Sequence, residues 1–313
     1  MENVIEIKNL TKYYGSFFWK KSIPALDDLS LDIPMGAVFG FLGPNGAGKT
    51  TTIKLLMDLI KPSDGEASIL GYPPENVEIK KQIGFLPDEP VFSSYLSANE
   101  FLNICAKLLG VPSNERKSRI AEVLEVVKMT KYAKSKLGGF SRGMVQRIGI
   151  AQAIINRPKL LILDEPLVGL DPHGRQELKD IILHQKANGT SVFFCSHILS
   201  DVETICDHLG ILYEGNLLCS GKLDDLLQDT GLSLHVNPGH DEIAKELLSE
   251  ASETVKLPDG GWNLTFVNQM EVKKTLLSVK EKNKGAVTII PAKENLEKFF
   301  FRKIEDAAKL TKA

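Results

Sequence analysis

The first part of the chain alternates apolar and polar residues in two stretches, residues 4–10 and 26–33. A period of two is typical of a strand with one buried face, so both stretches predict half-buried antiparallel strands. Gly15, Ser16 and Pro24 lie between them and indicate a long hairpin connection. We therefore expect an antiparallel pair of strands in this region.

Continuous apolar runs follow further along the chain. Residues 37–42 form a short apolar run, which precedes a glycine-rich turn and helical periodicity over 51–60. Pro158 introduces a second run, residues 159–166, of the kind found in strands that are buried on both faces. This alternation of strands and helices indicates a βαβ arrangement. It continues with a helix, a strand and a helix predicted at 173–187, 191–195 and 199–207.

A mainly helical region separates the two apolar runs. Residues 97–137 show helical periodicity with a break at 110–113, and a further helix is expected from Ser141 to Asn156. Glu214-Gly215 is typical of a tight hairpin. The strands of that hairpin are expected at 209–213 and 216–220.

The character of the chain changes after Gly221. Short strand-like runs alternate with helix-like runs, which predicts a small α+β domain over residues 221–313. The strand-like runs lie at 233–236, 262–267 and 286–290, and the helix-like runs at 241–250, 270–281 and 294–310. The last run carries one apolar face, formed by Leu296, Phe299, Phe300, Ile304 and Ala307. Packing on its own domain is the simpler interpretation of this face, and a partner-binding role is the alternative.

Composition and charge narrow the class of protein. The 313 residues suffice for about two domains. Lys and Arg number 38 against 40 Asp and Glu, and a net charge of −2 argues against a protein that mainly neutralises nucleic-acid phosphates. No apolar run approaches the roughly 18 residues of a membrane span, and the first residues lack the apolar core of a signal peptide. The four cysteines and six histidines show no metal-ligand spacing, so we expect reduced thiols in a cytosolic protein.

The most informative motif is GPNGAGKT, residues 43–50, which fits the phosphate-loop pattern GxxxxGK[ST]. Its glycines let successive N–H groups point into one concavity, and the following helix adds the positive end of its dipole. Lys49 is placed to reach the β- and γ-phosphates, Thr50 to bind Mg²⁺, and Thr51 to offer a hydroxyl near the α-phosphate. A helix-capping turn is the alternative, but the strand before the loop and the helix after it favour phosphate binding. The predicted nucleotide-binding residues of the loop are Gly43, Pro44, Asn45, Gly46, Ala47, Gly48, Lys49, Thr50 and Thr51.

Asp164 and Glu165 end the second apolar run. The carboxyl end of a strand beside a phosphate loop is where open α/β sheets bind ligands. Asp164 suits the Mg²⁺ shell. Glu165 is expected on the opposite face of the strand, where it would orient or deprotonate a water in line with the γ-phosphate. A solvated Asp-Glu turn is the alternative, which the upstream loop disfavours.

Two further segments follow these carboxylates. His197 comes after the strand predicted at 191–195, a position compatible with a contact to the γ-phosphate. A single histidine is more often a surface or cap residue, and that alternative stays open. GLDP, residues 169–172, is a turn that can equally be an ordinary loop.

Together these motifs resemble the ATP-binding subunit of ABC transporters. GPNGAGKT, FSRGMVQR, LLILDEP, GLDP and SH occur in this order within residues 1–220, and the combination is far more specific than any one motif. The resemblance implies an α/β P-loop cassette over 1–220, with a mixed core sheet, an antiparallel β subdomain and a helical subdomain at about 90–157. Residues 221–313 would form an accessory α+β domain. It also implies that the chain pairs head to tail with a second copy or a homologous cassette, around two ATP molecules.

Residues 140–144, FSRGM, resemble the signature segment of this family. The resemblance implies that Ser141 and Gly143 contact the γ-phosphate of ATP held by the opposite subunit. A serine-capped helix N-terminus is also an anion site on physical grounds, although Ser141 can simply cap its own helix. Arg142 and Met144 depart from the commonest form, LSGGQ, and are closer to the YSKGM form of two-gene bacterial exporters. The charge of Arg142 can also engage phosphate.

Other positions take roles through the same resemblance. Gln146-Arg147 keeps the QR that follows the signature, and Asp171 of GLDP corresponds to the D-loop. Asp88 stands where many members carry a glutamine that links Mg²⁺ to the membrane partner, and a carboxylate there can reach the metal through water. Glu89 is the alternative ligand, and a surface turn around these residues is the alternative to a metal role.

Tyr14 resembles the aromatic residue that stacks on adenine in this family, since an aromatic face can pack against the base. Tyr13 and Phe17 compete for this role, because the hairpin connection continues through Trp19. A place in the core of the hairpin is the alternative for each of these aromatic residues.

The leading interpretation is a Mg²⁺-dependent ATPase subunit of an ABC exporter, with ATP and Mg²⁺ as cofactors. A separate permease subunit would hold it at the cytoplasmic face of the membrane, and no nucleic-acid partner is expected. Its catalytic residues would be Lys49, Glu165 and His197, and its metal ligands Thr50, Asp164 and Asp88. One alternative is an ABC-type ATPase that acts in translation or DNA repair; a single phosphate loop and the 92 positions between Lys49 and Ser141 disfavour it. The other is a regulatory module that binds ATP but hardly hydrolyses it.

Overall fold

The computed structural model describes residues 2–15, 24–227, 229–248, 251, 253–266, 281 and 285–310. The chain divides into two compact units. The first comprises the residues up to Leu223 together with the end of the last helix from Lys303, and the second comprises Asp224–Arg302.

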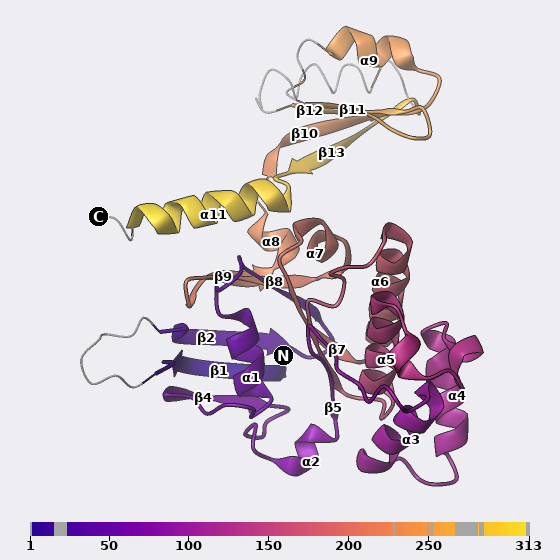
Figure 1. The fold of residues 1–313 in the computed structure, drawn as a ribbon. Coiled ribbons are helices and arrows are strands. Elements are labelled where there is room, and N and C mark those ends of the chain that lie inside the picture. The colour runs from indigo at the N-terminus through magenta and orange to yellow at the C-terminus, as the bar shows by residue number, and fades with distance from the viewer. Residues whose placement is uncertain are drawn as a thin grey trace. The chain divides into compact units, whose positions relative to one another are not determined.

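A six-stranded sheet forms the centre of the first unit (Figure 1). Its strands run in the order β5-β6-β7-β3-β8-β9, and all neighbours are parallel except β8 and β9. Every residue of β3, β6 and β7 is buried, which confirms for β6 the prediction of a strand covered on both faces. The bounds are β3 Val38–Leu42, β5 Ile83–Leu86, β6 Leu160–Asp164, β7 Ser191–Ser196, β8 His208–Tyr213 and β9 Asn216–Lys222.

A smaller antiparallel sheet has the order β2-β1-β4. The predicted pair is present as β1 (Asn3–Lys12) and β2 (Leu26–Pro34). Strand β4 (Asp64–Ile69), which pairs with β1, was not predicted from the sequence. This strand begins with Asp-Gly and lacks a regular apolar alternation, so its pairing with β1 rather than its own pattern makes it a strand. β5 was missed for a related reason, because it is only four residues long and stops at a proline.

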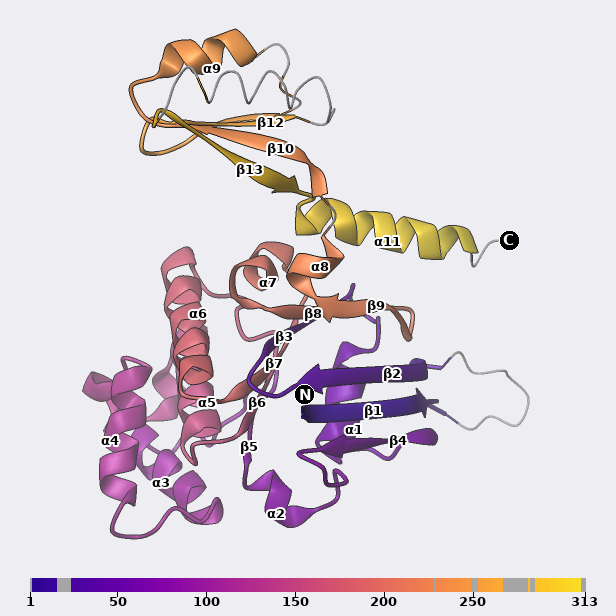
Figure 2. The ribbon, with the colours of Figure 1, turned by 180° about the vertical axis from the view of Figure 1, so that it is seen from behind.

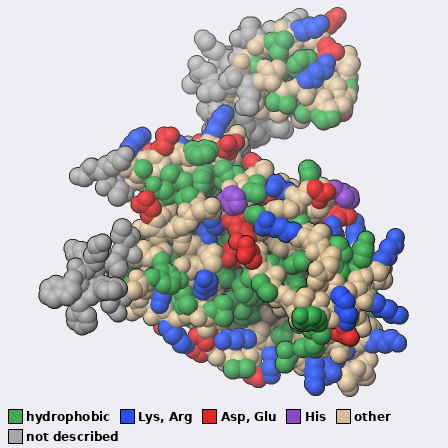
Figure 3. Space-filling view, viewed as in Figure 1, with side chains coloured by type: hydrophobic (Ala, Val, Ile, Leu, Met, Phe, Trp, Pro, Cys, Tyr) green, Lys and Arg blue, Asp and Glu red, His purple; other side chains and the backbone are tan. Residues whose placement is uncertain are grey.

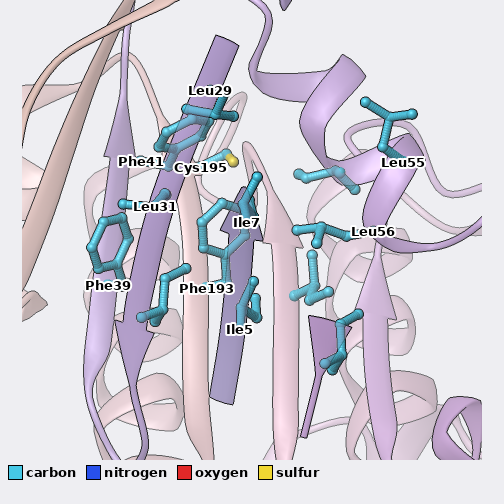
Figure 4. Close-up of a cluster of buried hydrophobic side chains, with 14 of the residues drawn as sticks. Ile5, Ile7, Leu29, Leu31, Phe39, Phe41, Leu55, Leu56, Phe193 and Cys195 are labelled. Carbon is cyan, nitrogen blue, oxygen red and sulfur yellow. The ribbon is translucent and has the colours of Figure 1, made fainter. Parts of the chain in front are cut away.

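The main core of the first unit lies where these two sheets face each other (Figure 4). Ile5 and Ile7 of β1 lie beside Phe193 of β7, and Phe39 and Phe41 of β3 belong to the same cluster. The rings of Phe41 and Phe193 are 5.3 Å apart, within the range of favourable aromatic contacts. Leu55 and Leu56 of the first helix complete the cluster (Figure 4).

The helices α3, α4 and α5 form a group at the opposite end of this unit from β1, β2 and β4 (Figures 1 and 2). Helix α4 ends at Val126, and two 3₁₀ turns at Thr130–Tyr132 and Leu137–Gly139 replace the helix that was expected to continue to 137. Lys128 has a φ of 58°, a backbone conformation that ends a helix. No helix of the described residues is both long and apolar enough to cross a membrane. The helices are α1 Lys49–Leu56, α2 Val77–Lys80, α3 Ala98–Leu108, α4 Arg116–Val126, α5 Arg142–Ile154, α6 Pro172–Ala187, α7 Leu199–Ile205 and α8 Leu223–Leu226.

Basic and acidic side chains are interspersed on the face shown in Figure 3. Hydrophobic side chains lie between them, and no single stretch of Lys and Arg covers this face. The distribution agrees with the net charge of −2.

The second unit is an α+β domain with an antiparallel sheet in the order β11-β12-β10-β13. Helix α9 covers one face of this sheet (Figure 2). Ala244 and Leu247 of the helix belong to the same buried cluster as Leu234 and Phe266 of the sheet. Strand β11 was not predicted from the sequence, and the helix expected at 270–281 lies, apart from its last residue, outside the described residues. In the last helix, α11, the predicted apolar residues Leu296, Phe299 and Phe300 are buried and Ile304 and Ala307 are half-buried. The bounds are β10 Asp229–Val236, α9 Asp241–Leu247, β11 Glu253–Lys256, β12 Trp262–Phe266, β13 Val287–Lys293 and α11 Leu296–Leu310.

Gly84 makes the contact between β5 and α5 so close that no other residue fits. A Cβ atom at this position would lie 2.0 Å from the carbonyl oxygen of Ala153. We predict that Gly84→Ala lowers the free energy of unfolding by about 2–3 kcal/mol, the usual cost of forcing a methyl group into a packed core. Urea unfolding followed by circular dichroism measures the change. Gly139→Ala is the matched control, because a Cβ there meets nothing within 4 Å; equal losses in the two variants would contradict the prediction.

Candidate nucleotide-binding site

The loop between β3 and α1 has a backbone that only glycine can adopt at several positions. Gly46 and Gly48 have φ values of 83° and 113°, and a Cβ at Gly43 would lie 2.4 Å from the carbonyl oxygen of Leu212. Helix α1 begins directly after Gly48, so its first N–H groups lack helical acceptors. The loop and the helix start together form a concavity that suits an anion.

Lys49 brings a buried positive charge to this loop. It is 6% exposed, and its Nζ donates a hydrogen bond of 2.7 Å to the carbonyl oxygen of Gly43. The same Nζ lies 3.5 Å from Oε1 of Glu165. The lysine therefore links the phosphate loop to the end of β6.

Asp164 ends β6 beside Thr50, whose hydroxyl donates a hydrogen bond of 3.1 Å to Oδ2. The second oxygen, Oδ1, is buried and has no hydrogen-bond partner among the described residues. Burial is the main cause that raises the pKa of Asp164 to about 6, and the nearby carboxylates of Asp88 and Glu165 raise it further. An unpartnered buried oxygen beside a hydroxyl and a further carboxylate is a donor set that fits Mg²⁺.

Glu165 follows β6 in a left-handed conformation, with a φ of 48°. Its side chain is 11% exposed, and Oε2 lies 2.9 Å from Nδ1 of His197. The expectation that Glu165 points to the opposite face of the strand from Asp164 was wrong, because the strand ends at Asp164 and the left-handed turn breaks the alternation. As a result both carboxylates reach the phosphate loop.

Tyr14 also reaches this loop from the end of β1. Its hydroxyl is 3.4 Å from Oγ1 of Thr51, and half of its surface is exposed. Phe17 and Trp19 lie outside the described residues. A pocket opens beside the loop and is lined by Ala25, residues 44–51, Asp88 and Glu165.

The residues of the signature-like segment lie elsewhere. Ser141 caps α5, since its hydroxyl accepts a hydrogen bond of 3.4 Å from the backbone N–H of Met144. Ser141 and Arg142 are exposed, and among the described residues none from 141 to 144 lines the phosphate-loop pocket. A single chain therefore leaves Ser141 and Arg142 open to solvent.

The GLDP turn lies between β6 and α6 and also contacts the start of α5. Asp171 caps α6 by accepting a hydrogen bond of 3.1 Å from the N–H of Gly174. Arg142 lies directly on Gly169, where a Cβ would be 2.7 Å from the guanidinium carbon. The N-termini of α5 and α6 are thus held side by side.

Comparison with known proteins identifies the family. A family model described as "ABC transporter" matches residues 26–168. An ABC transporter ATP-binding protein of a Nostoc species is 41% identical, over 97% of this chain and 90% of the relative. The chain belongs to the ATP-binding proteins of ABC transporters.

The further likenesses agree with this family. The bacitracin transport ATP-binding protein BcrA of Bacillus licheniformis is 45% identical, over 72% of each chain. A dimeric ATP-binding cassette solved in a post-hydrolysis state with ADP and phosphate superposes with a TM-score of 0.64. It is 25% identical and matches 70% of this chain and 98% of its own. The P-loop cassette fold that the motifs predicted is therefore confirmed.

Two residues of this ABC ATP-binding protein form contacts that the sequence analysis did not foresee. Gln146 is buried and donates a hydrogen bond of 2.9 Å to the carbonyl oxygen of Pro166. Glu177 of α6 pairs with Lys128 after α4 and with Arg147 of α5, and these bonds lower the pKa of Glu177 to about 2. Gln146 had a sequence signal, the QR after the signature, whereas Glu177 had none, because its partners come from distant segments.

The raised pKa of Asp164 predicts how the stability of the metal-free cassette depends on pH. The ordinary pKa of an aspartate side chain is 3.8, and that of Asp164 in the folded chain is about 6. Folding therefore disfavours ionisation of the Asp164 carboxyl group. Stability must therefore fall as the pH rises from about 4 through about 6, by roughly 2–3 kcal/mol at 1.4 kcal/mol per pKa unit. We predict that Asp164→Asn removes this loss. Urea unfolding at several pH values in EDTA tests it, and parallel pH profiles for the two proteins would contradict it.

Proposed function

We propose that this protein binds and hydrolyses Mg²⁺-ATP as the ATPase subunit of an ABC exporter. The observation that supports the proposal is the cluster of Lys49, Glu165 and His197 at the phosphate loop, with Glu165 within 3.5 Å of the lysine and 2.9 Å of the histidine. An ammonium, a carboxylate and an imidazole in this arrangement serve phosphoryl transfer, which depends on positioning and charge.

The phosphate loop would hold the nucleotide. Its N–H groups and Lys49 bind the β- and γ-phosphates, while Thr51 offers a hydroxyl near the α-phosphate and Tyr14 packs against adenine. Thr50 and Asp164 would hold Mg²⁺, with Asp88 contributing through water. Bound Mg²⁺ supplies charge neutralisation on the phosphates.

Glu165 would act as the general base. The oxygen of a water molecule attacks the γ-phosphorus, the bond from that phosphorus to the β–γ bridging oxygen breaks, and the proton of the water passes to Glu165. The products are ADP and phosphate. His197 orients the carboxylate of Glu165 and contacts the γ-phosphate. Lys49, which lies beside Glu165 in the nucleotide-free chain, would turn to the phosphates when ATP binds.

The signature-like residues would act on the ATP of a second cassette. Ser141, Arg142, Gly143 and Met144 form the N-terminus of α5; Ser141 and Arg142 are exposed and the first turn carries no acidic residue, so this helix start can receive an anion. The dimeric cassette that this fold resembles supports a head-to-tail pair. Asp171 would lie at the same interface, where it fixes the start of α6.

A separate permease subunit would turn the cycle of binding and hydrolysis into export. The bacitracin transport relative supports this role. We place the ATP-binding cassette at residues 1–220, with its helical subdomain at about 90–157, and an accessory domain at 221–313. The protein would then lie at the cytoplasmic face of the membrane, peripheral through its permease, and would bind no nucleic acid.

Glu165→Gln tests the base directly. We predict that turnover of ATP falls by about 100-fold or more, the effect expected when a general base is removed, while ATP still binds. Phosphate release and equilibrium binding of a fluorescent ATP analogue measure the two properties. A variant that binds ATP normally and keeps wild-type turnover would refute the role of Glu165.

Complementation tests whether the signature acts in trans. We predict that Lys49→Ala and Ser141→Arg chains are each inactive alone, because every site in either dimer lacks one group. A mixture should regain ATP hydrolysis, since a mixed dimer contains one site with both groups intact. A mixture that stays inactive, although a tagged pull-down shows mixed dimers, would contradict the arrangement.

A further inference from the structure

Glu165 is held in a conformation that its sequence disfavours. Its φ of 48° lies in the left-handed region, which costs conformational energy for any residue with a Cβ. The next residue is Pro166, and a residue before proline prefers extended conformations. Such a backbone persists only where its surroundings over-determine it.

Three hydrogen bonds around Glu165 supply that constraint. The N–H of Glu165 donates to the carbonyl oxygen of Cys195 at 3.1 Å, and its own carbonyl accepts from Val168 at 3.2 Å. The carbonyl of Pro166 accepts from Nε2 of Gln146 at 2.9 Å. Gln146 is 4% exposed, so water cannot readily take the place of its amide.

Gln146 differs from the other two partners, Cys195 and Val168, because it comes from α5 rather than from the neighbouring strand or the loop itself. It fixes the peptide that joins Pro166 to Leu167, one residue beyond Glu165. The far end of the loop is held separately, since Arg142 covers Gly169 and Gly143 lies beside Leu170. Loss of the Gln146 amide would therefore loosen the Glu165 end while the rest of the loop keeps its contacts.

We propose that Gln146 is a positioning residue for Glu165. By holding the carbonyl of Pro166 it keeps Glu165 in the left-handed conformation that aims its carboxylate at Lys49 and His197. Without this bond Glu165 relaxes toward the extended conformation preferred before proline, and the carboxylate leaves the site. This inference rests on the proposed function of Glu165 as the base.

Gln146→Met removes the amide and keeps the length and volume of the side chain. We expect kcat for ATP to fall by about 10- to 100-fold, the effect of a displacement near 1 Å at a reacting group. KM and ATP binding should stay within about twofold of the wild type, because the phosphate loop is untouched. Gln152→Met, a half-buried glutamine on the same helix, is the matched control and should keep wild-type kcat.

The double variant separates positioning from a general structural effect. If Gln146 acts through Glu165, Gln146→Met should cause no further loss of rate in the Glu165→Gln background, as measured by single-turnover hydrolysis with excess protein. A loss of equal size in both backgrounds, or wild-type kcat in Gln146→Met, would overturn the inference. If the methionine variant does not fold, Gln146→Asn retains an amide that is too short to reach Pro166, and the same outcomes apply.

The proposed function fails in a different way. A wild-type chain that hydrolyses no ATP, with or without its membrane partner, would refute the ATPase. Wild-type hydrolysis with an unchanged Gln146→Met variant would refute only the positioning role.

Discussion

Lys49 is surrounded by oxygen atoms at the carboxyl edge of the central sheet, between the carbonyl of Gly43 and the carboxylate of Glu165. Asp164 lies beside Glu165, and two carboxylates this deeply buried repel each other unless a cation is near. A single ammonium group offsets part of this repulsion in the nucleotide-free chain. The strands and loops around the site bring the ammonium group of Lys49 and the carboxylates of Asp164 and Glu165 close together.

The strand order explains how residues so far apart in sequence meet. Strands β6, β7 and β3 are neighbours and run parallel, so their carboxyl ends lie at the same edge. The phosphate loop follows β3, the two carboxylates follow β6, and His197 follows β7. The buried apolar residues of these strands hold the strand ends in place. The polar residues that follow the strands can therefore have different chemical roles at one site.

Much of this could be predicted from sequence, because the signals were local. The apolar runs of β3 and β6 indicate buried strands. The glycines of the phosphate loop indicate a tight backbone turn. β4 could not be found in this way, since its pairing with β1 rather than its composition makes it a strand. The direction of the Glu165 side chain could not be predicted either, because side chains alternate between the two faces only while the strand continues. The contact of Gln146 is known only from the structure, since its partner is the backbone carbonyl of a residue 20 positions away.

The site of the nucleotide-free chain contains energetically unfavourable features. Asp164 has a raised pKa and an unpartnered oxygen, and Glu165 has a strained backbone. Natural proteins commonly keep such unfavourable features where a ligand will relieve them. A cation at Asp164 would partner the free oxygen and offset the cost of the buried carboxylate, so binding should stabilise the folded state.

A crystal structure of the Glu165→Gln chain with Mg²⁺ and ATP tests this account most directly. The account predicts the phosphates in the loop of residues 43–50, Nζ of Lys49 moved from residue 165 to the β- and γ-phosphates, and the metal bound by Thr50 and reached by Asp164 directly or through water. Nucleotide bound away from this loop, or Lys49 still directed at residue 165 with ATP present, would contradict it.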